Sequence, residues 1–403
     1  MSFSRRSAVL IVEVELETPP PWDEGPLPVR EGEAIADAGA RRSYFNERSA
    51  QALYGPTRLH RNADRTIDPR HADFTVIGLE LVAGALLVIH GSLRADGLKL
   101  VESLARLVDL GPESPARHWC DDLLAGHGRI SASARRATAL VQVTPDGDLD
   151  RPLRSPDYDT WPRELQWLWL LASATPADAY SPPPEAGTGL SASVLRFSAG
   201  WRALVLRDGA AFLGSGPDMG PIYRLSPDPE LHFRSIYLDA FLLGMVQRLR
   251  LGEIADRLAS LGDPVRQPER LAELEQEAAE FRNVFWWQQL GAQWHGNQLL
   301  RAYQRQHEIP ELFSQVIGEL EDYSRKAQTA ATQRTEALLG IITVVGLPFG
   351  LAVGILHALE ITSWVWLAAS LAVAAVLSAA LLLTSPWRNL VRLWRVVGWR
   401  RQD

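Results

Sequence analysis

The sequence predicts an α/β cytoplasmic domain, a long helical stalk and two C-terminal transmembrane helices. Three observations carry this prediction. Apolar, β-rich runs broken by glycine fill the first part of the chain, helical periodicity follows them, and two stretches near the end have no charged side chain. The 403 residues allow two or three folding units. We assign residues 1–225 to the α/β domain, 226–334 to the stalk and 335–403 to the transmembrane domain.

The α/β domain begins with a strand. Arg5 and Arg6 precede the apolar run Ala8–Val12, but Glu13 and Glu15 interrupt that run too early for the core of a signal peptide. We therefore interpret the run as a first β-strand and expect the N-terminus to stay in the cytoplasm. Further strands are predicted within Phe74–His90 and Leu190–Leu213, with a hairpin turn at Asp208-Gly209.

Helices and loops separate these strands. The apolar spacing predicts helices over Leu98–Leu110 and Pro162–Ser173, and Thr160 is the expected N-cap of the second helix. The proline-rich stretches Thr18–Arg30 and Thr175–Gly189 predict surface loops. This mixture is typical of an α/β domain.

The stalk is predicted from helical periodicity after Glu230. Helices are expected over Leu231–Leu261 and Pro268–His307, and a third begins at Pro310. In the third helix, apolar residues recur at alternating spacings of three and four, the pattern of a helix that packs against others of its kind: Leu312, Val316, Leu320, Tyr323, Ala327 and Ala330. Nothing breaks this helix before Leu359, so it would be about 75 Å long at ~1.5 Å per residue.

Ala337–Leu359 and Ile361–Thr384 contain no charged side chain, and each exceeds the ~20 residues that a membrane-spanning helix needs. A buried helical hairpin is the alternative, but core helices rarely run so far without a charge. Arginine and lysine flank the pair outside the spans and are missing from the loop between them, which places both termini in the cytoplasm. We therefore expect a multi-pass protein of the inner (cytoplasmic) membrane, with the lipid bilayer as a partner.

Charge and composition exclude several other classes. The formal charge is −7, and residues 385–403 carry five arginines against Asp403, which leaves −7 − 4 = −11 on the rest. Because the large N-terminal part is acidic, no nucleic-acid partner is expected. The single cysteine, Cys120, excludes an internal disulfide framework. Three tryptophans among the tail arginines favour a segment on the inner headgroups over a protein-binding tail: Trp387, Trp394 and Trp399.

The first predicted span has a face of small residues. Gly346, Gly350 and Gly354 repeat every four residues, which lets helices approach closely in lipid and favours self-association. The alternative is a contact with the second span, which is rich in alanine. Pro348 removes one helix hydrogen bond, a defect that a membrane helix tolerates when neighbouring groups compensate.

The order of these elements, together with residues 339–348 (LGIITVVGLP) and Gly354-Ile355, resembles the CorA family of magnesium transporters. In sequence the resemblance is confined to about residues 319–355. Family members are pentamers whose first span lines the pore. The resemblance thus implies a homopentamer that carries magnesium or another divalent metal ion, with a coiled-coil-like stalk and these pore-lining residues: Glu336, Leu339, Thr343, Leu347 and Gly350. The alternative for Glu336 is an interfacial glutamate at the point where the helix enters the membrane.

One departure affects selectivity. The family's Gly-Met-Asn signature should follow Gly354-Ile355 by one residue, but His357-Ala358-Leu359 stands there. The loop holds Glu360 as its one acidic residue, so His357 and Glu360 form the expected outer mouth. Because imidazole becomes cationic in mild acid, we expect weak discrimination between magnesium and sodium and less cation flux when the outside is acidic. The alternative places His357 against lipid headgroups or the second span.

Other motifs predict no chemistry. A calcium loop that began at Asp146 would need glycine at its sixth position and glutamate at its twelfth, where Arg151 and Asp157 stand. His118 and Cys120 have no second cysteine or paired histidine nearby in the sequence. Gly214-Ser215-Gly216 is interpreted as a glycine-rich turn, and Trp286, Trp287 and Trp294 as packing on a helical face.

With no catalytic constellation, we expect no enzyme and no cofactor beyond Mg²⁺ as a transported or regulatory ion. The function predicted is a homo-oligomeric cation channel or transporter. Two alternatives stay open: a ligand-gated membrane effector whose cytoplasmic domain senses a small molecule such as a nucleotide messenger, and a membrane-anchored scaffold without a pore.

Overall fold

The computed structural model describes residues 1–31, 34–54, 58–63, 70–71, 73–215, 229–286, 290–291, 294–358 and 364–383. The chain divides into two compact units. The first contains residues 1–257 and 276–317, and the second contains residues 258–275 and 318–403. Glu360 and the arginine-rich and tryptophan-rich tail after residue 383 lie outside the described residues.

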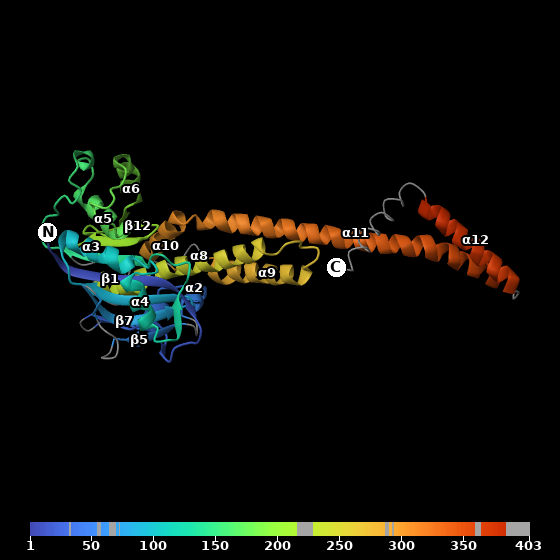
Figure 1. Ribbon diagram of the computed structural model, residues 1–403, viewed down its shortest axis with the longest axis horizontal. Coiled ribbons are helices and arrows are strands. Elements are labelled where there is room, and N and C mark those ends of the chain that lie inside the picture. The colour runs from blue at the N-terminus through green and yellow to red at the C-terminus, as the bar shows by residue number, and fades with distance from the viewer. Residues whose placement is uncertain are drawn as a thin grey trace. The chain divides into compact units, whose positions relative to one another are not determined.

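A mixed β-sheet forms the centre of the first unit, shown in blue to green in Figure 1. The strand order is β11-β12-β13-β10-β1-β8-β7-β5-β2, with β6 on β7 and β9 on β1. β10 and β13 pair in parallel, and the other described pairs are antiparallel. The strands are β1 (Phe3–Leu16), β2 (Asp23–Glu24), β5 (Leu59–Asn62), β6 (Arg70–His71), β7 (Phe74–Val82), β8 (Leu86–Leu93), β9 (Gly128–Ile130), β10 (Thr138–Pro145), β11 (Leu195–Arg196), β12 (Trp201–Leu206) and β13 (Gly209–Gly214). β3 (Val29–Glu31) and β4 (Ala34–Ala36) form a separate pair.

The two faces of β1 explain how the sheet is covered. Ala8, Leu10 and Val12 belong to a buried core together with residues of α3 (Gly97–Val108), α4 (Pro115–Leu123) and α5 (Arg163–Ser173). On the opposite face, Ser7 and Glu13 bond to Glu230 and Arg248 of the helical part. Because side chains alternate along a strand, this central strand is buried on both sides. The predicted α/β sheet domain is confirmed.

Two local predictions need correction. The hairpin is present, but Leu206 pairs with Gly209, so the turn is Arg207-Asp208 and Gly209 already belongs to β13. Thr160 does not cap α5. Pro162 occupies the N-cap with φ −55° and ψ 141° and makes no side-chain cap bond, so the helix begins three residues after Thr160.

Several short helices were not predicted. α1 (Ala38–Arg42) and α2 (Glu47–Leu53) are capped by the side chains of Asp37 and Asn46. α6 (Gly187–Ser193) replaces the start of the predicted Leu190–Leu213 strand region. Single 3₁₀ turns lie at η1 (Pro156–Tyr158) and η2 (Pro184–Ala186).

The helical part of the first unit begins with α7 (Pro229–His232), the π-turn η3 (Phe233–Tyr237) and α8 (Leu238–Ala259). α9 (Pro268–Glu280) continues through a second π-turn, η4 (Phe281–Phe285), and α10 follows (Trp294–Gln306). The prediction of one helix over Pro268–His307 was therefore wrong. Helical backbone ends at Trp286, whose ψ is 80°, and the Leu290 amide donates to Asn297 Oδ1 at 2.6 Å instead of continuing a helix.

The long helix is confirmed. α11 runs from Ile309 to Ala358 as 50 continuous residues, and α12 runs from Trp364 to Leu383. The first turns of α11 pack on the helical part of the first unit. The Phe313 ring stacks on Trp286 with centroids 4.3 Å apart and also contacts Phe281.

Candidate membrane helix and its open face

The C-terminal half of α11 exposes large apolar side chains. Leu339 and Leu347 are 58% and 57% exposed, and Ile342 is 65% exposed. Among the described helices, α11 is the one that is long and apolar enough to cross a membrane, judged by length and composition. α12 is also apolar but shorter. Exposed leucine and isoleucine at this density need cover from lipid or protein, because water around them is unfavourable.

The predicted pore-lining residues share one face of α11. At about 100° per residue, Glu336, Leu339, Thr343, Leu347 and Gly350 fall within an arc of about 80°. Adding the remaining predicted residues of this helix widens the arc to only about 100°: Gly346, Gly354 and His357. We call this arc the open face. All eight of these residues are exposed in the part of the chain that the structure describes.

The space beside the three glycines of the open face can be measured by the atoms that an added Cβ would meet. An added Cβ at Gly350 or Gly354 would meet no atom within 4 Å, and one at Gly346 would meet only Ile342 of its own helix at 3.9 Å. These distances concern the part of the chain that the structure describes. In this structure, therefore, these three glycines do not pack against α12, which was the alternative to self-association.

α12 packs on a different face of α11. Ser378 Oγ donates to the Val344 carbonyl oxygen at 3.0 Å, and Val344 and Ala374 are buried. Val344 lies about 110° around the helix from the middle of the open face. Figure 1 shows α12 lying back along the C-terminal part of α11. The open face is therefore left for something other than α12.

The polar residues on the open face are few. Glu336 and His357 are exposed, and the Thr343 hydroxyl donates to the Leu339 carbonyl one turn earlier at 2.8 Å. That bond uses the hydroxyl proton but leaves its oxygen able to accept. Glu360, the other predicted residue of the outer mouth, lies outside the described residues.

A buried ionic network in the first unit was missed by the sequence analysis. Asp239 of α8 accepts hydrogen bonds from Arg41 Nε and Nη2 at 2.8 and 2.7 Å, from Arg58 Nη2 at 2.8 Å and from the Tyr54 hydroxyl at 2.5 Å. Arg58 also pairs with Glu80 of β7. His90 of β8 lies 3.0 Å from Glu80, and Glu80 and His90 are fully buried. Two guanidiniums thus balance two carboxylates inside the unit.

The charges of this network shift the pKa values of its members. Burial raises the pKa of Glu80 and Asp239, but the guanidiniums of Arg58 and Arg41 outweigh it, so both carboxyl pKa values lie below their ordinary range. Burial lowers the pKa of His90, which keeps the ring neutral. An ionised carboxylate only accepts, so His90 Nε2 is the donor to Glu80.

These shifts predict that acid destabilises the first unit. The unfolded chain binds a proton at His90 below about pH 6.5, before the folded chain does, so stability starts to fall there. Glu80 and Asp239 add stability that is full above their ordinary pKa of about 4 and is lost as the pH falls below it. Urea unfolding at pH 7.5, 5.5 and 4 should show a falling midpoint.

His307 also makes the folded protein less stable in acid, because burial lowers its pKa to about 4. His90→Asn and His307→Asn proteins should therefore each lose part of the decline in the unfolding midpoint between pH 7.5 and 5.5. An unfolding midpoint that does not change with pH would contradict the charge states assigned to the network.

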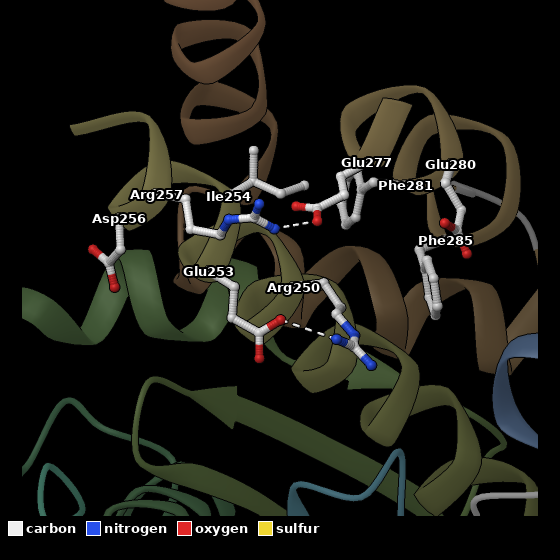
Figure 2. Close-up of a pocket in the computed structure, with 9 residues that line it drawn as sticks. All are labelled: Arg250, Glu253, Ile254, Asp256, Arg257, Glu277, Glu280, Phe281 and Phe285. Atoms are coloured by element: carbon white, nitrogen blue, oxygen red, sulfur yellow. Dashed lines mark hydrogen bonds and ion pairs between the residues drawn. The ribbon is translucent and has the colours of Figure 1, made fainter. Parts of the chain in front are cut away.

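A cavity of about 560 Å³ lies between α8, α9 and η4 (Figure 2). Its charged lining contains two ion pairs, Arg250 with Glu253 at 3.0 Å and Arg257 with Glu277. Phe281 and Phe285 supply an aromatic wall, with ring centroids 6.2 Å apart. Sequence reasoning missed this cavity because its lining comes from two helices that an irregular turn separates.

The other residues singled out in the sequence are dispersed. His118 Nδ1 lies 2.9 Å from the Ser114 carbonyl, Cys120 is buried, and Gly147 forms a turn with φ 96°. Trp286 packs on Phe313, while Trp294 is 63% exposed, and Trp287 lies outside the described residues. No group of three or more His, Cys, Asp or Glu side chains within the described ranges could hold a metal ion.

Comparisons with known proteins add no relative. The chain matches no protein-family model, and no curated protein and no solved structure is significantly similar to it.

Proposed function

We propose that the chain is a CorA-like, homo-oligomeric membrane protein that conducts cations, in which the C-terminal half of α11 and α12 both cross the inner membrane. Both termini would lie in the cytoplasm, and the oligomer would be a pentamer. The observation that carries this proposal is the open face. It combines a stripe of uncovered glycines with the residues expected at a pore, on an apolar helix whose contact with α12 lies elsewhere.

The same face explains why a second copy is the favoured neighbour. A lipid tail gains little from a glycine stripe, whereas another helix gains close backbone contact there. Because α12 leaves this face free, neighbouring copies can place their α11 helices around a common axis. Leu339, Thr343 and Leu347 would then form rings across the pore, with Glu336 at its cytoplasmic end.

The transported ion is proposed to be magnesium or another divalent metal, with weak preference over sodium. No ring of asparagine would receive the hydrated ion, because His357 and Leu359 stand at the signature positions. His357 is exposed on the last turn of α11, on the same arc as the pore-side leucines.

Leu339→Ser tests the proposed pore directly. Apolar rings close a pore by dewetting, so a hydroxyl in place of the leucine should keep water in the constriction and raise the conductance several-fold at rest. The measurement is the single-channel and macroscopic current of the purified protein in planar bilayers. Val345→Ser is the control, because Val345 is 38% exposed but lies outside the open face. Equal currents in wild type and Leu339→Ser would remove Leu339 from the pore.

The α8–α9 cavity favours a second candidate, the ligand-gated effector. A volume of about 560 Å³ suits a small molecule, and charged and aromatic side chains line it together. In this version the ion path is the same, but conductance appears only when a soluble small molecule is present. Currents recorded with and without a small-molecule extract of the source cells distinguish the ligand-gated effector from a channel that conducts without a ligand.

A further inference from the structure

The contact between α11 and α12 supplies a hydrogen bond that α11 itself cannot make. In an α-helix the amide of residue i donates to the carbonyl of residue i−4, so position 348 should serve the Val344 carbonyl. Pro348 has no amide hydrogen, and its ring pushes against that same carbonyl. The Val344 oxygen therefore loses its helical donor. Ser378 of α12 donates to this oxygen at 3.0 Å.

The behaviour of other hydroxyls on these helices shows that this bond is unusual. Ser370 donates to the Leu367 carbonyl and Thr343 to the Leu339 carbonyl, each within its own helix. Ser378 instead reaches a carbonyl 34 residues away, and the residue is only 6% exposed. Ala374, one turn earlier and 2% exposed, allows the two backbones to approach.

We propose that Ser378 is a positioning residue that caps the carbonyl freed by Pro348 and thereby fixes α12 against α11. The inference rests on the proposed placement of both helices in the apolar layer. There, water is not available as a substitute donor, so an uncapped carbonyl is costly. The hydrogen bond that Pro348 removes and the α11–α12 contact are thus coupled: where the two helices separate, the Val344 oxygen loses the donor that Ser378 supplies.

Restoring the amide should make the hydroxyl dispensable. Pro348→Ala supplies Val344 with its helical donor, so Ser378→Ala should weaken the α11–α12 contact when residue 348 is proline and change little when it is alanine. Hydrogen bonds between membrane helices suggest that the population of separated helices rises by about 3-fold to 20-fold in Ser378→Ala.

The test measures the distance between spin labels on cysteines introduced at Leu338 and Ala380, both exposed, in full-length protein in nanodiscs. Labelled chains are diluted with unlabelled ones so that each pair reports on one chain, and the buried Cys120 is replaced by alanine throughout. The experiment is a double-mutant cycle that compares wild type, Ser378→Ala, Pro348→Ala and the double variant. Ser370→Ala is the matched control, and Ser378→Thr, which keeps the hydroxyl, guards against a merely misfolded alanine variant.

The expected result is a longer or broader distance distribution in Ser378→Ala alone, with the double variant, Ser370→Ala and Ser378→Thr like wild type. An unchanged Ser378→Ala distribution would overturn the proposal. So would equal broadening with and without Pro348, or broadening in Ser378→Thr as large as in Ser378→Ala. Because the readout is a distance within one chain, it is independent of whether the protein assembles or conducts.

Discussion

Asp239→Ala should be the most destabilising single substitution in the first unit, by about 3–5 kcal/mol. It removes the carboxylate that accepts from Arg41, Arg58 and Tyr54, and it leaves two buried guanidiniums with only Glu80 to balance them. A buried charge without its partner cannot be solvated, which is why the loss exceeds that of an ordinary hydrogen bond. Urea unfolding of the detergent-solubilised protein, followed by tryptophan fluorescence, measures this loss.

Asp256→Ala is the matched control for that experiment. Asp256 lies on the same helix, α8, but is exposed, so its removal should change the unfolding free energy by no more than about 0.5 kcal/mol. If Asp239→Ala and Asp256→Ala unfolded at the same urea concentration, the ionic network would not contribute to the stability of the folded protein.

Gly350→Leu should abolish the oligomer. A leucine on the open face would hold neighbouring α11 helices apart, and the close backbone contact that drives association in lipid would be lost. In nanodiscs, the wild-type mass should be a multiple of 44.6 kDa, with five as the expected number, and the variant should have the mass of one chain.

Val345→Phe controls for added bulk, because Val345 is exposed outside the open face and its replacement should leave the oligomer intact. A Cβ added at Gly350 would meet no atom within 4 Å in the part of the chain that the structure describes, so the substitution should not disturb the fold of the monomer. A wild-type protein that is monomeric in both detergent and nanodiscs would contradict the proposed assembly.

The long helix was predictable because its determinants are local. Pro310 sits in the first turn, where a missing amide is harmless, and no glycine pair or charge cluster ends the pattern before Ala358. The central strand and the β12–β13 hairpin were predictable for the same reason, since apolar runs and a turn dipeptide lie within a few residues of each other. The position of the hairpin turn alone differed, by one residue.

The remaining features depend on contacts between distant residues. The break after η4 is fixed by Asn297 and by the bond from the Asn46 amide to the Leu290 carbonyl, and neither is visible in the local pattern of Pro268–His307. Arg41 and Asp239 are 198 residues apart, so no spacing rule could pair them. Similarly, the sequence at Pro348 predicts a missing helix hydrogen bond, but it does not predict that Ser378 supplies the replacement donor.

The candidate site was predictable only as a set of residues on one helix face. The spacing of Glu336, Leu339, Thr343 and Gly350 implies a shared arc wherever the helix is continuous. What the sequence left open was which face the second apolar helix covers. The Ser378–Val344 contact answers this for a single chain, because it occupies another side of α11.

Cation flux into lipid vesicles tests the central claim most directly. Purified full-length protein is reconstituted, and entry of Mg²⁺ and Na⁺ is followed by fluorescent indicators, with and without a small-molecule extract of the source cells and with Gly350→Leu as the control. We expect both ions to enter through the wild-type protein without the extract, with little preference between them, and neither to enter through the variant. Flux that required the extract would favour the ligand-gated effector. Vesicles that stay tight to both ions under every condition would contradict the proposal that the open face of α11 lines a cation path.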